Sequence, residues 1–595
     1  MPDTVAMPTW TRAAAAAGWI VAAALAWRSF DAPPVSADRA EALLALHAEL
    51  FEDIPRPTGS PAAARARERV RRALDAAGCP TQEHVAWSCR PGVCARVVNL
   101  WCRIEAGDRP AVVGMAHTDS VPAGPGAGDD GAGVVAWVDT VRRLDRDALA
   151  RPFVLVLTDG EELGLLGARA WLADPPTGPI GEVVNLEARG TGGASLMFET
   201  VGPPRPWGRT FAGLGTGLNG SALYPAVYER IPNDTDLSEV RRAGIAGVNH
   251  AFLGNVAQYH TPLDDRAHLD PRSLAHHADL AGRWVRALQH PQEGAPVTFV
   301  DVFGYAVLWW PTAVGPAGAV LCAVGWLLWL VADLRGGRVR ARELVAAGLG
   351  ALAVPIVAAL AAEALGAGIA EVAGPVWWGR PWPLRLATWC LTAACALGLG
   401  RVGTPLARWG AAVGIGCTAL GVGVAVEPRL AVLGLPALAV GIGWRTAWAR
   451  RPDLGVLGLG PATAVFWLPL AFGLEEALTA LHLAVIAVPL GIALVGAGPA
   501  MPARPGRPAA ALVLAALGFA AIAALGPAFT PERPRPTTAV WTDDLDGAEL
   551  VTQDLLTGRA HTERRPGLAL PPPEVVWDDK HTARLIPARG GQLEG

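Results

Sequence analysis

Hydrophobic residues follow two different patterns along the 595-residue chain. Between residues 29 and 300, short apolar runs alternate with charged segments, which is typical of a soluble domain. From about residue 303 to 530, Ala, Leu, Val and Gly form successive apolar segments, each long enough to cross the ~30 Å hydrocarbon core of a bilayer. The pattern therefore predicts a soluble domain followed by a membrane domain.

The soluble region is predicted to alternate strands with helices. Ser36 and Ser60 are the expected N-caps of two amphipathic helices. The helices are expected at 37–52, 61–77, 131–145, 163–173 and 272–289, and the strands at 81–88, 95–104, 111–116, 153–158 and 182–186. This alternation predicts an α/β fold, with a mostly parallel twisted sheet and helices on both of its faces.

The apolar segments predict an all-α, polytopic membrane domain with eight spans. They lie at 314–333, 344–366, 384–403, 407–426, 429–447, 455–473, 475–497 and 508–526. A ninth span, at 11–27, precedes the soluble region. We interpret it as a retained anchor rather than a signal peptide, because residues 27–30 (Trp-Arg-Ser-Phe) offer no small-residue cleavage site.

Arginine predicts the orientation of the spans. The loop after the second span holds Arg335, Arg338, Arg340 and Arg342, and every second loop after it also carries arginine. The positive-inside rule makes these loops cytoplasmic and places the soluble region and the tail outside, in a periplasmic, extracellular or lumenal space. The predicted organisation is an anchor (1–28), a soluble domain (29–300), a membrane domain (301–530) and a small β-rich extracytoplasmic tail (531–595).

Net charge and cysteine usage agree with an outer domain. A net charge of −4 argues against a nucleic-acid partner. Four of the eight cysteines lie in the soluble region, at positions 79, 89, 94 and 102. We expect disulfides, among them a bond that closes the hairpin between Cys89 and Cys94, with the full connectivity left open. The alternative is a structural zinc on the four thiols, although their spacing is not that of two CxxC pairs.

Candidate metal ligands follow several of the expected strands. His117 follows the run at 111–116, Glu161 and Glu162 follow the run at 153–158, and Glu187 follows the run at 182–186. Side chains at the carboxyl ends of such strands meet at one edge of an α/β sheet. The set is completed by Asp129, on a Gly-rich loop, and by His260.

These residue types are the ones that two zinc ions require. Imidazole and carboxylate suit each ion, and one carboxylate can bridge them. Five candidates serve as ligands: His117, Asp129, Glu162, Glu187 and His260. Glu161 remains beside a ligand, where it can act as a general base.

The motifs resemble a known family, the co-catalytic di-zinc aminopeptidases, whose relatives include glutamate carboxypeptidase, the transferrin-receptor ectodomain and glutaminyl cyclase. The matching segments are 117–120 (His-Thr-Asp-Ser), 125–131 (Pro-Gly-Ala-Gly-Asp-Asp-Gly), 160–167 (Gly-Glu-Glu-Leu-Gly-Leu-Leu-Gly), 185–187 (Asn-Leu-Glu) and 259–264 (Tyr-His-Thr-Pro-Leu-Asp). A soluble domain framed by membrane spans resembles a narrower branch, the endoplasmic-reticulum and vacuolar membrane metallopeptidases.

The resemblance implies a role for each ligand. His117 and Glu187 would hold one zinc, Glu162 and His260 the other, and Asp129 would bridge the two. The neighbouring Asp130 is the lesser candidate for the bridge. The soluble aminopeptidases have Asp where this chain has Glu187, whereas the membrane branch tends to have Glu.

The resemblance also implies catalytic roles. Glu161 would activate a zinc-bridged water, and Tyr259 would stabilise the tetrahedral oxyanion. Asp119 and Asp264 would each accept the second imidazole N–H of a histidine ligand. Weaker candidates for substrate binding are Arg189 and residues 233–236, whereas His250, His276 and His277 are expected to be structural.

The predicted function is that of a membrane-anchored exopeptidase with two zinc ions, an aminopeptidase that acts on peptides. One alternative is a single-zinc aminoacyltransferase like glutaminyl cyclase. The other is a non-catalytic receptor or transporter with a relic hydrolase domain. Glu363 and His482 fall within spans, where they indicate either a polar pathway or burial between helices. The sequence leaves the oligomeric state open.

Overall fold

The fold was examined in a computed structural model of the chain. The structure describes residues 9–586 except for 92, 231–232, 375–378, 479–481, 502–505, 534–536, 545–546, 555–559, 566–573 and 580–581. Its contacts divide the chain into two compact units. One unit consists of residues 31–220, 227–296 and 530–595, and the other of residues 1–30, 221–226 and 297–529.

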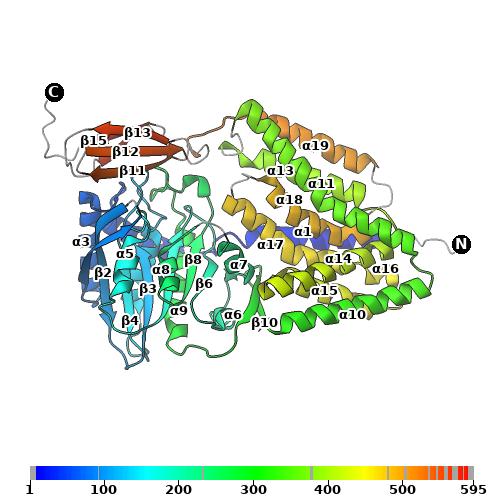
Figure 1. Cartoon of the computed structure of the whole chain (residues 1–595), viewed down its shortest axis with the longest axis horizontal. Helices are drawn as coiled ribbons and strands as arrows, with labels where there is room; N and C mark the ends of the chain where they lie inside the picture. The colour runs from blue at the N-terminus through cyan, green and yellow to red at the C-terminus, as the bar shows by residue number, and fades with distance from the viewer. Residues whose placement is uncertain are drawn as a thin grey trace. The chain divides into compact units, whose positions relative to one another are not determined.

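The first unit is built around an eight-stranded sheet with the strand order β1-β2-β4-β3-β5-β8-β6-β7 (Figure 1). Its strands are β1 (Gln82–Arg90), β2 (Val93–Ile104), β3 (Ala111–His117), β4 (Phe153–Thr158), β5 (Ile180–Ala188), β6 (Leu196–Val201), β7 (Asn219–Gly220) and β8 (Ala246–Phe252). Its helices are α2 (Ala37–Leu50), α3 (Pro61–Ala76), α4 (Gly131–Arg143), α5 (Leu166–Ala173), α6 (Trp207–Ala212), α8 (Asp236–Arg242), α9 (Pro271–Leu288) and the 3₁₀ turn η1 (Val256–Gln258).

The predicted α/β fold is confirmed, and its sheet is mixed, with parallel strands at the centre and antiparallel pairs toward the edges. The four central strands β4, β3, β5 and β8 run parallel, but β1, β2 and β6 pair antiparallel with their neighbours. Strands β1 and β2 are joined by a short connection, which suits an antiparallel pair and leaves no room for a helical crossover. The parallel centre is the part that carries the site.

Helices cover both faces of the sheet, as predicted. Helices α4 and α9 contact β3 and β5 and pack against α2, whereas α5 and α8 contact strands of the sheet and each other. A buried cluster that includes Met115, Val154, Trp171 and Leu237 fills the space beneath α5 and α8. The continuous burial of β3 and β4 explains their uninterrupted apolar runs.

Local signals predicted several boundaries correctly. The Ser36 side chain accepts a hydrogen bond from the Arg39 N–H, and the Ser60 side chain accepts one from the Ala63 N–H. Two disulfides form, Cys79–Cys102 and Cys89–Cys94, and the second closes the β1–β2 hairpin. The alternative of a zinc on the four thiols is therefore not what the structure contains.

The second unit is a helical bundle with one hairpin. It contains α1 (Thr9–Arg28), β9 (Val297–Val302), β10 (Ala306–Pro311), α10 (Val314–Arg335), α11 (Ala341–Ala373), α13 (Pro381–Leu399), α14 (Pro405–Val426), α15 (Ala431–Ala447), α16 (Pro452–Gly455), α17 (Leu459–Leu478), α18 (Leu483–Ala497) and α19 (Gly506–Ala524), with η2 (Pro428–Leu430) and η3 (Gly498–Ala500). The short helix α7 (Leu223–Tyr228) has its residues up to 226 in this unit and its last two residues in the first unit.

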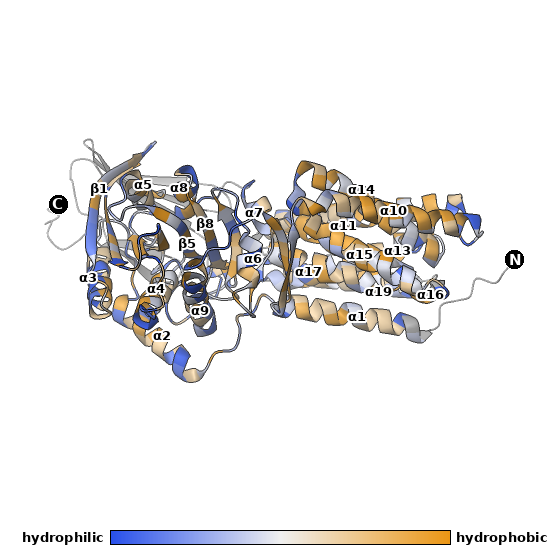
Figure 2. Cartoon of the chain, turned by 90° about the horizontal axis from the view of Figure 1, so that it is seen from below, coloured by the Kyte–Doolittle hydropathy of each residue, from blue (hydrophilic) through white to orange (hydrophobic). Residues whose placement is uncertain are grey.

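Six segments among the described residues are long and apolar enough to cross a membrane. They are Val314–Arg335, Ala341–Ala373, Pro405–Val426, Pro428–Ala447, Leu483–Ala500 and Gly506–Ala524. The other three predicted spans are also helices, namely α1, α13 and α17, but they are not among these six. Large apolar side chains on the bundle surface are exposed, such as Leu321, Leu328 and Leu360, and Figure 2 shows the predominance of hydrophobic residues in these helices. The unit has the character of an integral membrane domain.

The tail is β-rich, as expected. It contains β11 (Thr537–Asp544), β12 (Gly547–Asp554), β13 (Ala560–Arg565), β14 (Glu574–Asp579) and β15 (Thr582–Ile586). The first three strands form one antiparallel sheet, and the last two form another.

Candidate metal centre

The five predicted ligands lie together at one edge of the central sheet. His117 is the last residue of β3, Glu187 lies near the end of β5, and Glu162 follows β4. Asp129 comes from the loop before α4, and His260 from the segment after η1. Three parallel strands therefore supply one ligand each at their carboxyl ends, and two loops complete the set.

Asp129 lies between the two histidines. Its Oδ1 is 3.1 Å from Nε2 of His117, and its Oδ2 is 3.1 Å from Nε2 of His260. Each imidazole also has a glutamate beside it. Oε2 of Glu162 is 3.3 Å from Nε2 of His260, and Oε2 of Glu187 is 3.8 Å from Nε2 of His117. The arrangement consists of two histidine–glutamate pairs that share one aspartate.

The neighbouring Asp130 is engaged in a different way. Its Oδ1 caps α4 by accepting the Gly133 N–H at 3.0 Å, and its Oδ2 accepts the backbone N–H of His117 at 3.3 Å. Donor atoms of Asp130, His117 and Glu187 still lie within 4.8 Å of one another, so Asp130 is close to the site. Because its oxygens already serve backbone donors, the geometry favours Asp129 as the shared carboxylate.

Asp119 holds the backbone of the turn that carries Glu161 and Glu162. Its carboxylate accepts the N–H of Glu161 and the N–H of Glu162, each at 3.2 Å, and the hydroxyl of Thr58 at 3.2 Å. Oδ1 of Asp119 is also 3.5 Å from Nδ1 of His117, whose closer partner, at 3.1 Å, is the backbone carbonyl of Asp119. Asp119 is fully buried. It therefore fixes the turn that carries both glutamates.

Asp264 holds the backbone of the loop that carries Asp129. Its carboxylate accepts the N–H of Gly128 at 2.6 Å and the N–H of Asp129 at 3.2 Å. The predicted contact was with the imidazole of His260, whereas the contacts present are with the backbone. The effect is to hold the Asp129 peptide in place.

Arg56 is a residue of the site region that sequence reasoning missed. Its side chain is 2 % exposed and donates to the carbonyls of Thr118, Pro125 and Gly126. It thereby ties the segment after β3 to the Gly-rich loop that carries Asp129. A buried arginine cannot be recognised by its type alone. The adjacent segment 57–61, with two prolines and a glycine, was the available signal.

Asn185 is a second such residue. Its side-chain amide donates to Oε1 of Glu187 and to Oδ1 of Asn249, both at 3.1 Å. Asn185 is fully buried on β5, two residues before the glutamate on the same face of the strand. This contact orients Glu187 toward the histidines.

The buried carboxylates of the site would be stabilised by a nearby positive charge. Burial raises the pKa of Glu161 and Glu187 well above the usual range for glutamate, and the neighbouring carboxylates raise it further. Oε1 of Glu162 is buried and has no hydrogen-bond partner. Buried carboxylates that lack donors are normally paired with cations or metals. The donor set of imidazole and carboxylate suits zinc.

Tyr259 and Arg189 lie next to this cluster. The Tyr259 ring stacks on the His260 imidazole with 3.7 Å between centroids, and Cζ of Arg189 is 5.9 Å from the centre of the tyrosine ring. Burial raises the pKa of Tyr259, and the carboxylates of Asp129 and Glu162 raise it further. The phenol therefore stays protonated and can act as a hydrogen-bond donor.

The other histidines are structural, as expected. Nε2 of His250 accepts the indole N–H of Trp284 at 2.8 Å, and Nδ1 of His277 is 2.8 Å from the Ser195 hydroxyl. Burial lowers the pKa of His276 to about 4, where Nδ1 accepts the N–H of Ser195. These neutral imidazoles connect α9 to the sheet.

Comparison with known proteins identifies the domain that carries these residues. Residues 99–285 match Peptidase family M28. This segment is an M28 peptidase domain. The predicted resemblance to a zinc-peptidase family is thereby confirmed.

Relatives of the M28 domain include membrane proteins. The chain is 32% identical over 208 residues to a vacuolar membrane protease of Lachancea thermotolerans, covering 33% of this chain and 22% of the relative. It is 28% identical over 251 residues to endoplasmic reticulum metallopeptidase 1 of Homo sapiens, covering 39% and 28%. The chain thus spans about a quarter of the length of the curated relatives that it matches.

Solved structures similar to this chain include a Zn-dependent exopeptidase of Parabacteroides distasonis and a glutaminyl cyclase of Bacteroides thetaiotaomicron. The first is 17% identical with a TM-score of 0.34, covering 44% of this chain and 100% of that chain. The second is 14% identical with a TM-score of 0.34 and the same coverage.

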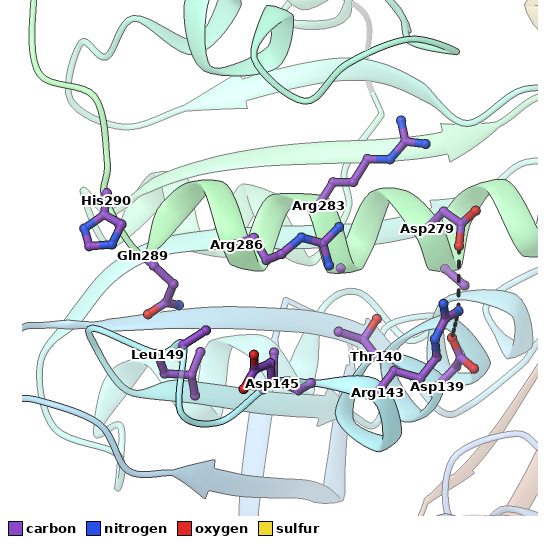
Figure 3. A pocket seen from close by; sticks show the side chains of 14 residues that line it. Asp139, Thr140, Arg143, Asp145, Leu149, Asp279, Arg283, Arg286, Gln289 and His290 are labelled. Atoms are coloured by element: carbon purple, nitrogen blue, oxygen red, sulfur yellow. Dashed lines mark ion pairs between the residues drawn. The ribbon is translucent and has the colours of Figure 1, made fainter.

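A hollow of about 420 Å³ on the M28 domain is separate from the ligand set. It lies where α4 and α9 cross (Figure 3). Asp139 and Asp279 of these helices are bridged by Arg39 at 2.7 and 3.5 Å, and Arg143 pairs with both at longer range. None of the predicted ligands lines the hollow. It is a charge-paired helix crossing rather than a part of the metal centre.

Proposed function

We propose that the chain is a membrane-anchored, zinc-dependent exopeptidase, and specifically an aminopeptidase with two zinc ions. The observation that carries the proposal is the position of Asp129. Its Oδ1 lies 3.1 Å from Nε2 of His117 and its Oδ2 lies 3.1 Å from Nε2 of His260, and each histidine has a glutamate beside it. Such a shared carboxylate is what a two-metal site requires. The M28 domain and its protease-named relatives support the same conclusion.

Each residue has a defined task in this proposal. His117, Glu187 and Asp129 would hold one ion, and His260, Glu162 and Asp129 the other. Bound zinc would supply Lewis acidity and lower the pKa of water toward ~7.

The side chains around the metal site would carry the proton transfers. Glu161 would accept a proton from the attacking water and return it to the leaving amine, a contribution typically worth about 10²–10⁴-fold. The Tyr259 hydroxyl would donate to the oxyanion that forms on the substrate carbonyl.

The decisive test is the Glu161→Gln variant of the full-length chain. We expect unchanged zinc content and a fall in peptide hydrolysis of about 10² or more, because the amide cannot accept the proton. The matched control is Glu83→Gln, which makes the same change on exposed β1 and should leave activity unaltered. Normal turnover of the zinc-loaded Glu161→Gln variant would remove Glu161 from the mechanism.

Metal content tests the ligand assignment. We expect two zinc ions per chain, and Asp129→Ala should lose both metal and activity, whereas Asp130→Ala should lose less. The opposite order would transfer the shared role to Asp130. One zinc per chain would favour the glutaminyl-cyclase-like alternative, and none would favour the non-catalytic receptor or transporter.

Substrate polarity and sidedness complete the proposal. An aminopeptidase should cleave a peptide with a free amino terminus and reject its N-acetylated form, whereas a carboxypeptidase should cleave both. We further propose that the M28 domain lies on the extracytoplasmic side. Thiols introduced at Arg338 and at Gly567, which lies outside the described residues, should label from opposite sides of the membrane.

A further inference from the structure

A cavity of about 520 Å³ lies within the membrane unit, between α1, α17 and α18. Its walls are mostly apolar and include Trp19, Ile20, Leu457 and Leu494, and Arg12 is the one charged residue among the described side chains that line it. The lining residues come from the first half of α1, the start of α17 and the end of α18. The cavity therefore lies toward one end of these helices.

Arg12 has no partner in the described part of the chain. Its Nε atom is buried without a hydrogen bond, and its guanidinium forms no ion pair with a described carboxylate. A cation beside apolar walls that lacks a counter-charge is costly within a membrane protein.

A second arginine lies at the rim of the same cavity. Arg408, in the first turn of α14, is 6% exposed, and its Nε atom is also without a partner. Its guanidinium donates to the carbonyl of Met501, at 3.3 Å, and Met501 lines the cavity. Arg12 and Met501, the residue that the Arg408 guanidinium contacts, thus both line this cavity. Among the described residues the cavity lining holds no carboxylate, so two cations at this cavity favour the binding of an anion.

The position of this pair indicates the source of the anion. Arg408 lies beside the loop that carries Arg401, one of the Arg-rich loops predicted to be cytoplasmic. Basic pockets between membrane helices on that side attract anionic lipid headgroups. A free inorganic anion would neutralise the arginines but would leave the adjoining apolar cavity unfilled. An amphiphile would satisfy both parts.

We propose that this cavity binds an anionic phospholipid. The phosphate would accept hydrogen bonds from Arg12 and Arg408, and an acyl chain would lie against Trp19, Ile20 and Leu494. The bound lipid would link α1 to the helices of the carboxy-terminal half of the bundle. This site is independent of the peptidase chemistry, because none of its residues belongs to the metal centre.

The test uses the purified full-length chain in detergent, with lipid binding counted by native mass spectrometry. Phosphatidylglycerol should bind more tightly than phosphatidylcholine of the same acyl chains, by about fivefold for each arginine, the ratio that corresponds to ~1 kcal/mol per basic residue at an anionic surface. Arg12→Gln and Arg408→Gln should each reduce the preference about fivefold, and Arg408→Lys should retain most of it. Arg342→Gln, in the first turn of α11 and outside the cavity lining, is the matched control.

A cavity-filling variant tests the apolar half separately. Ala497 lines the cavity, and Ala497→Phe should weaken the binding of both lipids without changing their ratio. Equal binding of the two lipids by the wild-type chain would overturn the proposal. So would an undiminished preference in either glutamine variant. Displacement of the lipid by excess inorganic phosphate would also overturn it and would make this a site for a free anion.

Discussion

Asp119 offers a sharp test of how the M28 domain positions its catalytic turn. The change is Asp119→Asn, which keeps the shape of the side chain but replaces one acceptor oxygen with a donor NH₂ group. In the native protein, one oxygen accepts the Glu161 N–H and the other accepts the Glu162 N–H, each at 3.2 Å. Whichever way the amide turns, one of these two backbone donors must face another donor.

The size of the effect follows from burial. Asp119 is fully buried, so water cannot replace the lost acceptor. A buried donor left without a partner costs about 1–3 kcal/mol, which is about 5- to 150-fold in an equilibrium constant. Because Glu162 is a proposed ligand, we expect zinc affinity to fall by about 10- to 100-fold, the range seen when groups that orient metal ligands are removed.

The assay is competition for zinc with a calibrated chelator, together with peptide hydrolysis at saturating zinc. The control is Asp75→Asn on the surface of the domain, where the carboxylate also accepts a backbone N–H, from Thr81 at 2.7 Å, but is open to solvent. That variant should change neither quantity. Wild-type zinc affinity and activity in Asp119→Asn would refute the reasoning, because they would mean that the turn holds its geometry without this carboxylate.

Two further predictions concern the stability of the same domain. Gly114→Ala on β3 should destabilise it by about 1–3 kcal/mol, because the new Cβ would lie 2.9 Å from the ring of the fully buried Trp137. The paired variant is Gly282→Ala on α9. Its new Cβ would lie 3.5 Å from the flexible end of the Arg286 side chain, so we expect it to stabilise the domain by about 0.5–1 kcal/mol. Thermal unfolding that ranks the two variants in the opposite order would contradict these packing contacts. For pH dependence, burial raises the pKa of Glu199 to about 7, from the usual 4.5 of a glutamate side chain. The protonated side chain therefore contributes stability that is complete below pH ~4.5 and is lost as pH rises through ~7. Glu199→Gln should flatten the decline of Tm over that interval. An unchanged slope would exclude Glu199 as the source of the decline.

The sequence by itself determined the elements that depend on near neighbours. The apolar runs of β3, β4 and β5 and the caps Ser36 and Ser60 were predicted close to their observed positions because their signals are local. The family resemblance could also be recognised from the sequence, because its motifs are short contiguous segments. The strands β6 to β8 and the helices α6 to α8 were not predicted, since their runs are short and carry weak periodicity.

Tertiary structure decided what depends on residues that are distant in the chain. Arg56 acquires its role only because the chain folds back over the Gly-rich loop, and Asp264 lies 135 residues beyond the backbone N–H of Asp129 that it holds. The sequence already favoured Asp129 over Asp130, but only the fold shows that Asp130 caps α4. The antiparallel edges of the sheet and the Cys79–Cys102 bond likewise depend on which segments meet in space. Burial and hydrogen-bond partners are properties of the folded chain as a whole, so the spacing of residues could nominate the ligands but could not assign the groups that hold them.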